Sequence, residues 1–257
     1  MCRFLAYTGE PVFLDTLLIE PASSLVSQSL AAREAKTLVN GDGCGVGWYG
    51  ARAEPGVYRG TLPAWSDANL ASLCHQVEAP MFLAHVRSAT SGEVSMANCH
   101  PFAAGRHLFM HNGQIGGYDR IRRSVEAMIP DDLYARRRGN GDSEAIFLAA
   151  LGHGLDADPV TALARTLAVC TRMMHANAIA SALRFTAILA DGDSLIAIRW
   201  ASDDHPPSLY WRQLDTGIAI ASEPFGDPGD AWHPVPPGSV MTAGRGEVSF
   251  NDFVVAA

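Results

Sequence analysis

The alternation of hydrophobic and polar residues predicts strands at both ends of the chain and helices between them. Residues 3–8 are apolar and aromatic, which predicts a buried strand close to the N-terminus. The clearest helix is predicted from Asp158 and Pro159, because a capping Asp and a proline at the first helical position precede apolar residues spaced three and four apart. After Ser181, short apolar runs alternate with turn residues, which indicates antiparallel strands. This order indicates one α+β domain over residues 1–257.

The same patterns predict the remaining elements. Shorter helices are expected at residues 21–35, 67–75 and 145–151. Strands are expected at residues 46–49, 81–86, 106–111, 185–190, 195–200, 208–212, 217–221, 238–242 and 248–254. No internal repeat, low-complexity stretch or linker interrupts the pattern, so no domain boundary is predicted inside the chain.

A glycine-rich segment, residues 40–50, carries glycine at the alternate positions 41, 43, 45 and 47. A dinucleotide-binding loop opens a helix, whereas a strand-like run follows these glycines, so a dinucleotide site is not predicted. Alternating glycines leave one face of a strand without side chains, which lets another backbone or a ligand approach closely. Cys44 lies inside this segment and is predicted to be a packed residue rather than a nucleophile.

The composition is that of a globular protein with a substantial core. Of its 257 residues, 48% are hydrophobic and 18% are charged. The formal net charge of −8 argues against nucleic acid and anionic membrane as partners. Lys36 is the only lysine, so a pyridoxal Schiff base or a P-loop would have to use that residue. No cofactor is expected.

The start of the chain and its cysteines bear on location. Residues 1–8 contain one arginine and too short an apolar run for a secretory signal, and no stretch approaches about 18 uninterrupted apolar residues. The five cysteines show no Cys-x-x-Cys spacing, so free thiols in a reducing compartment are favoured over disulfides. A cytoplasmic protein with no membrane partner is therefore expected.

The first residues, Met1-Cys2-Arg3, suggest a nucleophile at the N-terminus. If Met1 is removed, Cys2 carries both a thiol and a free α-amine. The α-amine titrates near about 7.7 to 8.0, so at neutral pH part of it can accept a proton, and a thiol near about 8.5 needs only modest help to become a thiolate. Cys is a small second residue, the kind after which the initiator Met is commonly removed, so the mature chain is expected to begin at Cys2. A retained Met1 would leave Cys2 with an amide nitrogen.

Four further residues are candidates for a site. Arg87 follows a predicted buried strand, where its guanidinium could pair with a substrate carboxylate or take part in an interior ion pair. Asn112 and Gly113 follow another strand, and Asn-Gly is by itself the commonest hairpin signal. Alternatively, the Asn112 amide and the Gly113 N–H could form an oxyanion hole. Asp142 precedes a helical run, where it could act as an N-cap, hold a substrate ammonium, or do both.

These positions together resemble the class II glutamine amidotransferase domain, an N-terminal-nucleophile hydrolase. The motifs that carry the resemblance are Met1-Cys-Arg3, Asp42-Gly-x-Gly-x-Gly-Trp48, His85-x-Arg-x-Ala-Thr90, His111-Asn-Gly113 and Gly141-Asp-Ser-Glu144. The chain is most similar to the stand-alone branch that includes the γ-glutamyl hydrolase of ergothioneine biosynthesis. Ser88, where amidotransferases usually have an aromatic residue, favours that branch, as does Ala221-Ser-Glu-Pro-Phe225. The resemblance implies a four-layer αββα sandwich of two antiparallel sheets between helices.

The resemblance also implies roles for individual residues. Cys2 would attack the γ-carboxamide carbon of a glutaminyl group, its α-amine would relay the proton to the leaving group, and water would hydrolyse the thioester to glutamate. Asn112 and Gly113 would stabilise the oxyanion. Arg87 would bind the substrate α-carboxylate and Asp142 its α-ammonium, and His111 is grouped with them as a substrate-binding residue.

Several alternatives stay open. The chain could cleave a γ-glutamyl amide such as glutamine or a γ-glutamyl conjugate for its own sake, or it could be a glutaminase subunit that delivers ammonia to a separate synthase. A catalytically inactive γ-glutamyl-binding regulatory module is a third hypothesis. The histidines and cysteines in the middle third of the chain suggest a metal-dependent hydrolase as a further hypothesis. No His-Glu-x-x-His motif or paired cysteine spacing occurs, so no metal site is predicted.

Overall fold

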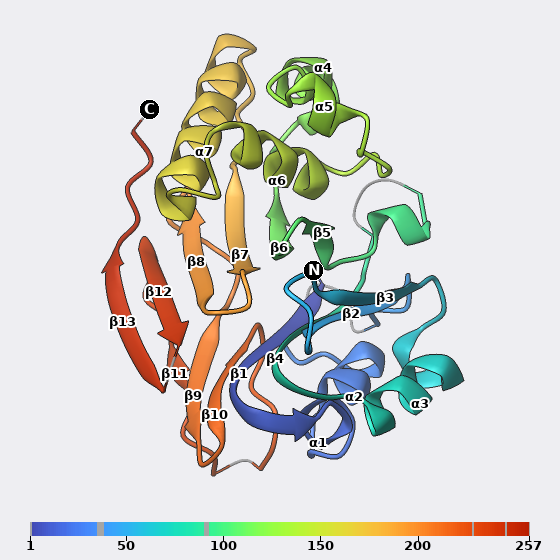
Figure 1. The fold of residues 1–257 in the computed structure, drawn as a ribbon. Helices are drawn as coiled ribbons and strands as arrows, with labels where there is room; N and C mark the ends of the chain where they lie inside the picture. The colour runs from blue at the N-terminus through green and yellow to red at the C-terminus, as the bar shows by residue number, and fades with distance from the viewer. Residues whose placement is uncertain (1, 35–38, 90–92, 228, 245, 257) are drawn as a thin grey trace.

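Two antiparallel sheets, packed face to face, lie between two layers of helices (Figure 1). The computed structural model describes all residues except 1, 35–38, 90–92, 228, 245 and 257. In the described part of the chain no helix combines the length and apolar character needed to cross a lipid bilayer.

The first sheet has seven strands in the order β11-β9-β10-β1-β4-β2-β3. Their bounds are β1 Arg3–Phe13, β2 Cys44–Tyr49, β3 Gly56–Gly60, β4 Glu78–Val86, β9 Tyr210–Leu214, β10 Gly217–Ala221 and β11 His233–Pro234. The N-terminal strand β1 is central, because it pairs with β4 on one side and with β10 on the other. The outer face of the sheet packs against α1 (Asp15–Leu18), α2 (Leu25–Leu30), the 3-10 turn η1 (Ala64–Ser66) and α3 (Ala68–Gln76).

The second sheet has six strands in the order β13-β12-β8-β7-β6-β5. Their bounds are β5 Phe102–Ala104, β6 His107–Gln114, β7 Arg184–Ala190, β8 Leu195–Ala201, β12 Ser239–Gly244 and β13 Glu247–Asp252. Its outer face is covered by α4 (Tyr118–Glu126), α6 (Asp142–Gly152) and α7 (Pro159–Ala176), with α5 (Asp131–Tyr134) beside them. The 3-10 turn η2 (Met96–Asn98) precedes β5.

The core is divided into three apolar layers, one between the sheets and one between each sheet and its helices. The layer between the sheets is formed from both of them, with Phe4 and Leu83 on one side and Leu108 and Met110 on the other. These layers and the antiparallel pairing confirm the predicted αββα arrangement.

The hydrophobic pattern predicted most elements correctly, with differences at their ends. Asp158 caps α7 as predicted, since its carboxylate accepts the backbone N–H of Thr161. The helix predicted at residues 21–35 is much shorter, because α2 ends at Leu30, and residues 35–38 lie outside the described part of the chain. Cys44 is buried in the layer between the first sheet and its helices, as predicted.

Side-chain alternation along the strands decides which residues face the space between the sheets. In β1, Phe4 points into that space, whereas Leu5 points toward the helices. In β6, Met110 points into it, whereas Phe109 points toward α6 and α7. The same alternation puts Cys2 and Asn112 between the sheets.

Candidate functional site

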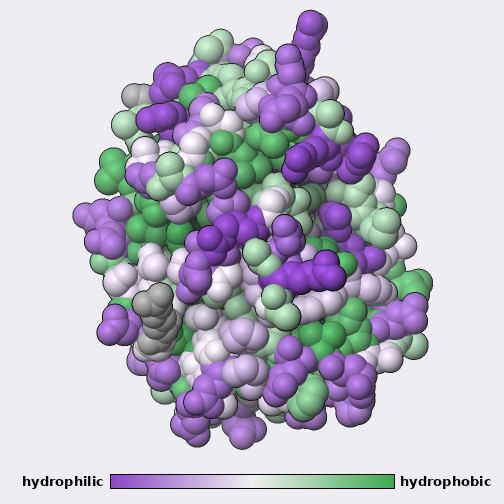
Figure 2. Space-filling view, in the orientation of Figure 1, coloured by the Kyte–Doolittle hydropathy of each residue, from purple (hydrophilic) through white to green (hydrophobic). Residues whose placement is uncertain are grey.

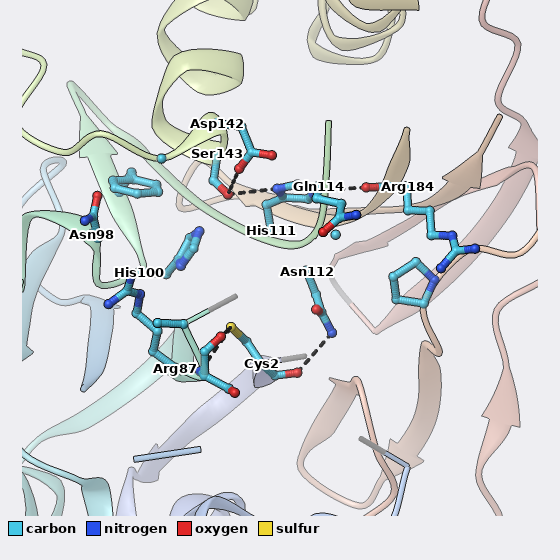
Figure 3. Close-up of a pocket in the computed structure, with 16 residues that line it drawn as sticks. Cys2, Arg87, Asn98, His100, His111, Asn112, Gln114, Asp142, Ser143 and Arg184 are labelled. Carbon is cyan, nitrogen blue, oxygen red and sulfur yellow. Dashed lines mark hydrogen bonds between the residues drawn. The ribbon is translucent and has the colours of Figure 1, made fainter. Parts of the chain in front are cut away.

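All six residues singled out from the sequence line one pocket at the end of the space between the sheets. The lining residues are Cys2, Arg87, Ser88, Ala89, Asn98, His100, Phe102, His111, Asn112, Gly113, Gln114, Gly141, Asp142, Ser143, Arg184 and Pro207 (Figure 3). They come from the residue before β1, the segment after β4, η2, β5, β6, the start of α6, β7 and the loops next to these elements. In the space-filling view, hydrophilic residues lie across the middle of this face, at the level of the N-terminus (Figure 2).

Cys2 is half-buried, and its sulfur lies against the backbone of Ser88. The Ser88 N–H donates to Cys2 Sγ at 3.4 Å, and Sγ lies 3.5 Å from the Ser88 carbonyl oxygen. Burial raises the pKa of the Cys2 thiol, although the Ser88 hydrogen bond and the positive charge of Arg87 act in the opposite direction. The thiol is therefore protonated at neutral pH, and a nucleophilic role requires a base close to it.

Asn112 and Gly113 lie inside a strand, so the hairpin interpretation of this dipeptide is wrong. They pair with Thr186 and Phe185 of β7 in register. Local sequence favoured a turn, but pairing with β7 extends β6 to Gln114 and overrides that preference. The buried Asn112 side chain points toward Cys2, and its Nδ2 donates to the Cys2 carbonyl oxygen at 3.0 Å.

Gly113 has a backbone conformation that requires glycine. Its φ of +151° is rarely adopted by residues with a side chain. A Cβ at this position would lie 1.9 Å from the Arg184 carbonyl oxygen and 2.7 Å from His111 Nε2. The strand can therefore turn its backbone at the pocket only if residue 113 is glycine.

Arg87 directly follows β4, and the glycine-rich segment holds its backbone. Its N–H donates to the Gly43 carbonyl oxygen at 2.8 Å, and its own carbonyl accepts the Asp42 N–H at 3.0 Å. The Asp42 carboxylate then accepts the Ala89 N–H at 2.7 Å. The segment from Arg87 to Ala89, which forms one wall of the pocket, is thus fixed by the Asp42-Gly43 pair.

Asp142 and His111 are connected through Ser143 at the start of α6. Gly141 occupies the N-cap position and Asp142 is the first helical residue, so the N-cap prediction for Asp142 is wrong. The Asp142 carboxylate instead accepts the backbone N–H of Ile115 at 2.7 Å, which ties the helix to the end of β6. His111 Nδ1 lies 2.9 Å from Ser143 Oγ. Burial lowers the pKa of His111, which is therefore neutral at pH 7.

Sequence reasoning missed four buried residues around the pocket. Asn98 accepts the Asn140 N–H at 3.0 Å, and Glu144 accepts the Gly139 N–H at 2.7 Å, so both shape the loop before α6. His85 and His100 lie with ring centroids 4.3 Å apart. Their motifs, His-x-Arg and Cys-His-Pro, were visible, but nothing local in the sequence indicates that they meet.

Of the histidines that suggested a metal site, His85 and His100 lie beside the pocket, whereas two others lie away from it. His75 is exposed beside Asp15, and His107 lies 2.6 Å from Asp156, away from the pocket. Among the residues that the structure describes, no group of three or more His, Cys, Asp or Glu side chains could hold a metal ion. The geometry gives a metal-dependent hydrolase no support.

Comparison with known proteins identifies the family. The family model described as "Glutamine amidotransferases class-II" matches residues 16–205. The chain belongs to this family. The match begins after Cys2 and does not cover that residue.

Two curated relatives of this class II glutamine amidotransferase cover most of its length. The chain is 30% identical to the probable glutamine amidotransferase DUG3 of Saccharomyces cerevisiae, over 94% of this chain and 81% of the relative. It is 31% identical to the γ-glutamyl-hercynylcysteine sulfoxide hydrolase of Mycolicibacterium smegmatis, over 92% of both chains. The family therefore includes relatives named as hydrolases of γ-glutamyl compounds.

Solved structures support the same fold. A glutamine aminotransferase class-II domain protein from Silicibacter pomeroyi superposes with a TM-score of 0.81 at 37% identity, over the full length of both chains. The glutamine phosphoribosylpyrophosphate amidotransferase of Bacillus subtilis gives 0.67 at 13% identity, and this chain matches half of it. At that identity the second likeness shows the fold alone.

Proposed function

We propose that this protein hydrolyses a γ-glutamyl amide bond through a thioester at Cys2. The observation that carries the proposal is the meeting of Cys2 with Asn112. These residues come from different sheets and are 110 positions apart in sequence, yet the Asn112 amide donates to the Cys2 carbonyl at 3.0 Å. A side-chain amide donor therefore lies at the residue that carries the thiol, and acyl transfer from an amide uses such a donor close to the nucleophile.

The oxyanion would form next to Asn112 and Gly113. Asn112 Nδ2 carries two hydrogens, and its bond to Cys2 uses one of them. The other can donate to the carbonyl oxygen of the substrate as it becomes negative. That bond strengthens as charge develops, so it lowers the energy of the transition state more than that of the bound substrate.

The glutamyl group would bind between Arg87 and Asp142. Both residues line the pocket, and they reach it from different elements, the end of β4 and the start of α6. A glutamyl headgroup has one α-carboxylate and one α-ammonium, so one cation and one anion complement it in charge. The neutral His111 would orient this side of the pocket through Ser143, to which it is hydrogen-bonded.

The reaction would proceed in two stages. The Cys2 α-amine, freed by removal of Met1, takes the thiol proton while Sγ attacks the amide carbon. The tetrahedral intermediate then collapses, the α-amine passes the proton to the leaving ammonia or amine, and a thioester remains on Cys2. Water attacks the thioester, again through an oxyanion at Asn112 and Gly113, and glutamate leaves with regeneration of the thiol.

Hydrolysis of a γ-glutamyl compound as the protein's own activity is favoured over delivery of ammonia to a separate synthase. The support is the near full-length match, 92% of both chains, to a relative that is named as a hydrolase of a γ-glutamyl compound. In this reading the partner is a small-molecule γ-glutamyl substrate. A separate synthase stays the alternative, and it would require that ammonia rather than a larger amine be the product.

The experiment offers glutamine, glutathione and a γ-glutamyl sulfur-histidine conjugate to the purified protein and to its Cys2→Ala variant, and follows released glutamate. We expect glutamate from at least one substrate with the wild type and none with the variant. Glutamate release that persists in Cys2→Ala rejects the thioester. Release only from glutamine, increased by a synthase, would support ammonia delivery.

Intact-mass measurement of the same preparation tests the regulatory-module hypothesis. Loss of one methionine mass is required for the proposed base. If active protein retains Met1, the α-amine mechanism is wrong. If Met1 is retained and no substrate releases glutamate, the chain is better described as a γ-glutamyl-binding module.

A further inference from the structure

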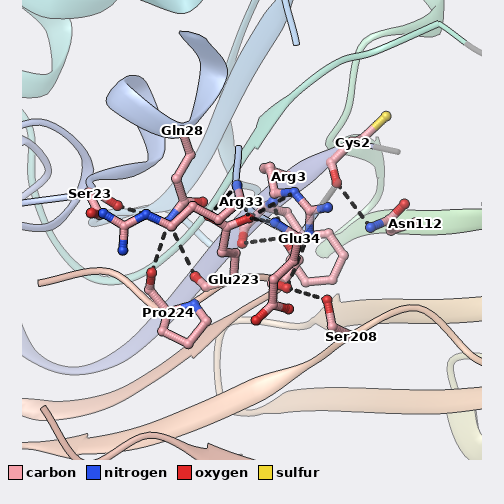
Figure 4. A network of polar contacts seen from close by, with 12 residues as sticks. Cys2, Arg3, Ser23, Gln28, Arg33, Glu34, Asn112, Ser208, Glu223 and Pro224 are labelled. Atoms are coloured by element: carbon pink, nitrogen blue, oxygen red, sulfur yellow. Dashed lines mark hydrogen bonds and ion pairs between the residues drawn. The ribbon is translucent and has the colours of Figure 1, made fainter. Parts of the chain in front are cut away.

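Behind Cys2, on the opposite face of β1, lies a fully buried arginine. Side chains alternate along the strand, so Arg3 points away from the pocket, toward the segment between α2 and β2 (Figure 4). It has no exposed surface, and burial lowers the pKa of its guanidinium. A buried cation of this kind needs an opposite charge, because isolated charges are strongly disfavoured away from water.

Glu223 supplies that charge and comes from the other end of the chain. Its carboxylate is 3% exposed and its Oε2 lies 3.5 Å from Arg3 Nε. The same carboxylate accepts the backbone N–H of Arg33 at 3.0 Å and that of Glu34 at 2.9 Å. Glu223 therefore connects the first residues of the chain to the segment at residues 33–34, and both of its oxygens are used.

Ser222 holds the residue after Arg3 through the backbone. The pairing of β1 with β10 ends at Leu5 and Ala221, and Ser222 continues it. The Phe4 N–H donates to Ser222 Oγ at 2.9 Å, and the Ser222 N–H donates to the Phe4 carbonyl at 3.0 Å. Arg3 Nη1 also donates to the Ser222 carbonyl at 3.2 Å. Ser222 and Glu223 thus bind the start of β1 at its first two residues, Arg3 and Phe4.

We propose that Glu223, through its ion pair with Arg3, is a positioning residue that holds Cys2 in register with Asn112. The proposal rests on the proposed function, in which Cys2 is the nucleophile. Cys2 is the residue immediately before Arg3, so a shift of Arg3 toward water would move the sulfur relative to the oxyanion donors. Misplacement of a reacting group by about 1 Å costs up to about 10²-fold in rate.

The discriminating variant is Glu223→Gln, which keeps the shape of the side chain but removes its charge and one acceptor oxygen. We expect kcat for the best γ-glutamyl substrate to fall by about 10- to 100-fold, while KM changes by less than about threefold. KM is expected to hold because Arg87 and Asp142 belong to other elements. Titration of Cys2 with iodoacetamide, followed by intact mass, should still label one equivalent of this residue per folded chain.

A matched control is Asp230→Asn. Asp230 forms an ion pair with Arg212 of β9 in the same sheet, it is partly buried, and neither residue lines the pocket. This substitution should leave kcat and KM unchanged even if it lowers the unfolding temperature. An equal loss of kcat in both variants would show a general loss of stability and would overturn the proposal.

The outcomes separate this proposal from the proposed function. If the Cys2→Ala variant turns over substrate at the wild-type rate, the thioester mechanism is wrong, and the positioning role is wrong with it. If turnover depends on Cys2 but Glu223→Gln retains kcat per labelled Cys2, only the positioning role is wrong. If Glu223→Gln does not fold, Arg3→Lys decides by the same kcat and KM criteria, because lysine keeps the charge but lacks the planar guanidinium that donates to the Ser222 carbonyl while it lies against the Glu223 carboxylate.

Discussion

The two ends of the space between the sheets differ in chemistry although the same strands form both. Away from the pocket, the inward-facing residues of β1, β4 and β6 are apolar, such as Ala6, Leu83 and Leu108, and lie in one buried layer. At the other end the strands deliver Cys2, Arg87 and Asn112, which line the pocket. The apolar end is held by close packing, with the Tyr49 hydroxyl bonded to backbone carbonyls, whereas at the polar end the Asn112 side chain of one sheet donates to Cys2 beside the other.

This difference indicates that one end of each strand provides stability and the other end provides the pocket residues. Close packing fixes the apolar end, because interiors of proteins are packed as densely as organic crystals. A strand held in this way carries its terminal residue with little freedom, so the pocket residues are placed by packing that lies several residues away. Substitutions at the polar end should therefore change catalysis, and substitutions at the apolar end should change stability.

Asn112→Ala gives the largest expected effect at the polar end. Loss of one oxyanion donor typically lowers kcat by about 10²- to 10³-fold, or about 3 to 4 kcal/mol. The fold should persist, and iodoacetamide should still label Cys2. Steady-state kinetics and alkylation, measured together, check this, and an unchanged kcat would remove Asn112 from the oxyanion hole.

Leu83→Ala tests the apolar end of the neighbouring strand β4. Leu83 is fully buried between the sheets, so its truncation should lower the free energy of unfolding by about 2 to 5 kcal/mol. Urea denaturation measures this loss. The kcat of the folded fraction should stay close to that of the wild type, and a large drop in kcat without a loss of stability would contradict the division between the two ends.

Arg87→Lys tests recognition at the polar end. Lysine keeps the charge but not the planar fork that matches a carboxylate. We expect KM for a γ-glutamyl substrate to rise by about 10- to 100-fold, which corresponds to a lost charged hydrogen bond, while kcat changes less. A substrate analogue that lacks the α-carboxylate provides the control, since its KM should not respond to the substitution.

Acidification should destabilise the folded protein through two buried histidines beside the pocket. Burial lowers the pKa of His85 to about 3 and that of His100 well below its ordinary value. The unfolded chain binds these protons below about 6.5 while the folded chain does not. Stability is therefore fully present above this pH and falls as the pH decreases toward 3, by about 1.4 kcal/mol per pH unit for each histidine. Urea denaturation between pH 5 and 7.5 measures the slope, which His100→Gln should reduce.

Most elements of the fold were predictable because a short-range pattern encodes them, whereas α1, α4, α5, β3, β5 and β11 were not predicted. The helix from Pro159 carries its cap and its apolar spacing within a few residues, and the strands near the C-terminus carry theirs. Asn112-Gly113 was ambiguous for the same reason. A turn and a strand end have the same local signal, and only pairing with Thr186 and Phe185 selects the strand.

The sequence alone determined the fold class, the family resemblance and which positions carry chemistry, because periodicity and motifs lie within short stretches of chain. The tertiary structure decided that Cys2 faces Asn112, that Asp142 holds Ile115 rather than capping its helix, and that Arg3 is paired with Glu223. Each of these is a contact between residues that lie far apart in the sequence. Periodicity indicates which face of a strand a residue occupies, but the residue across from it depends on which strands and sheets pack together.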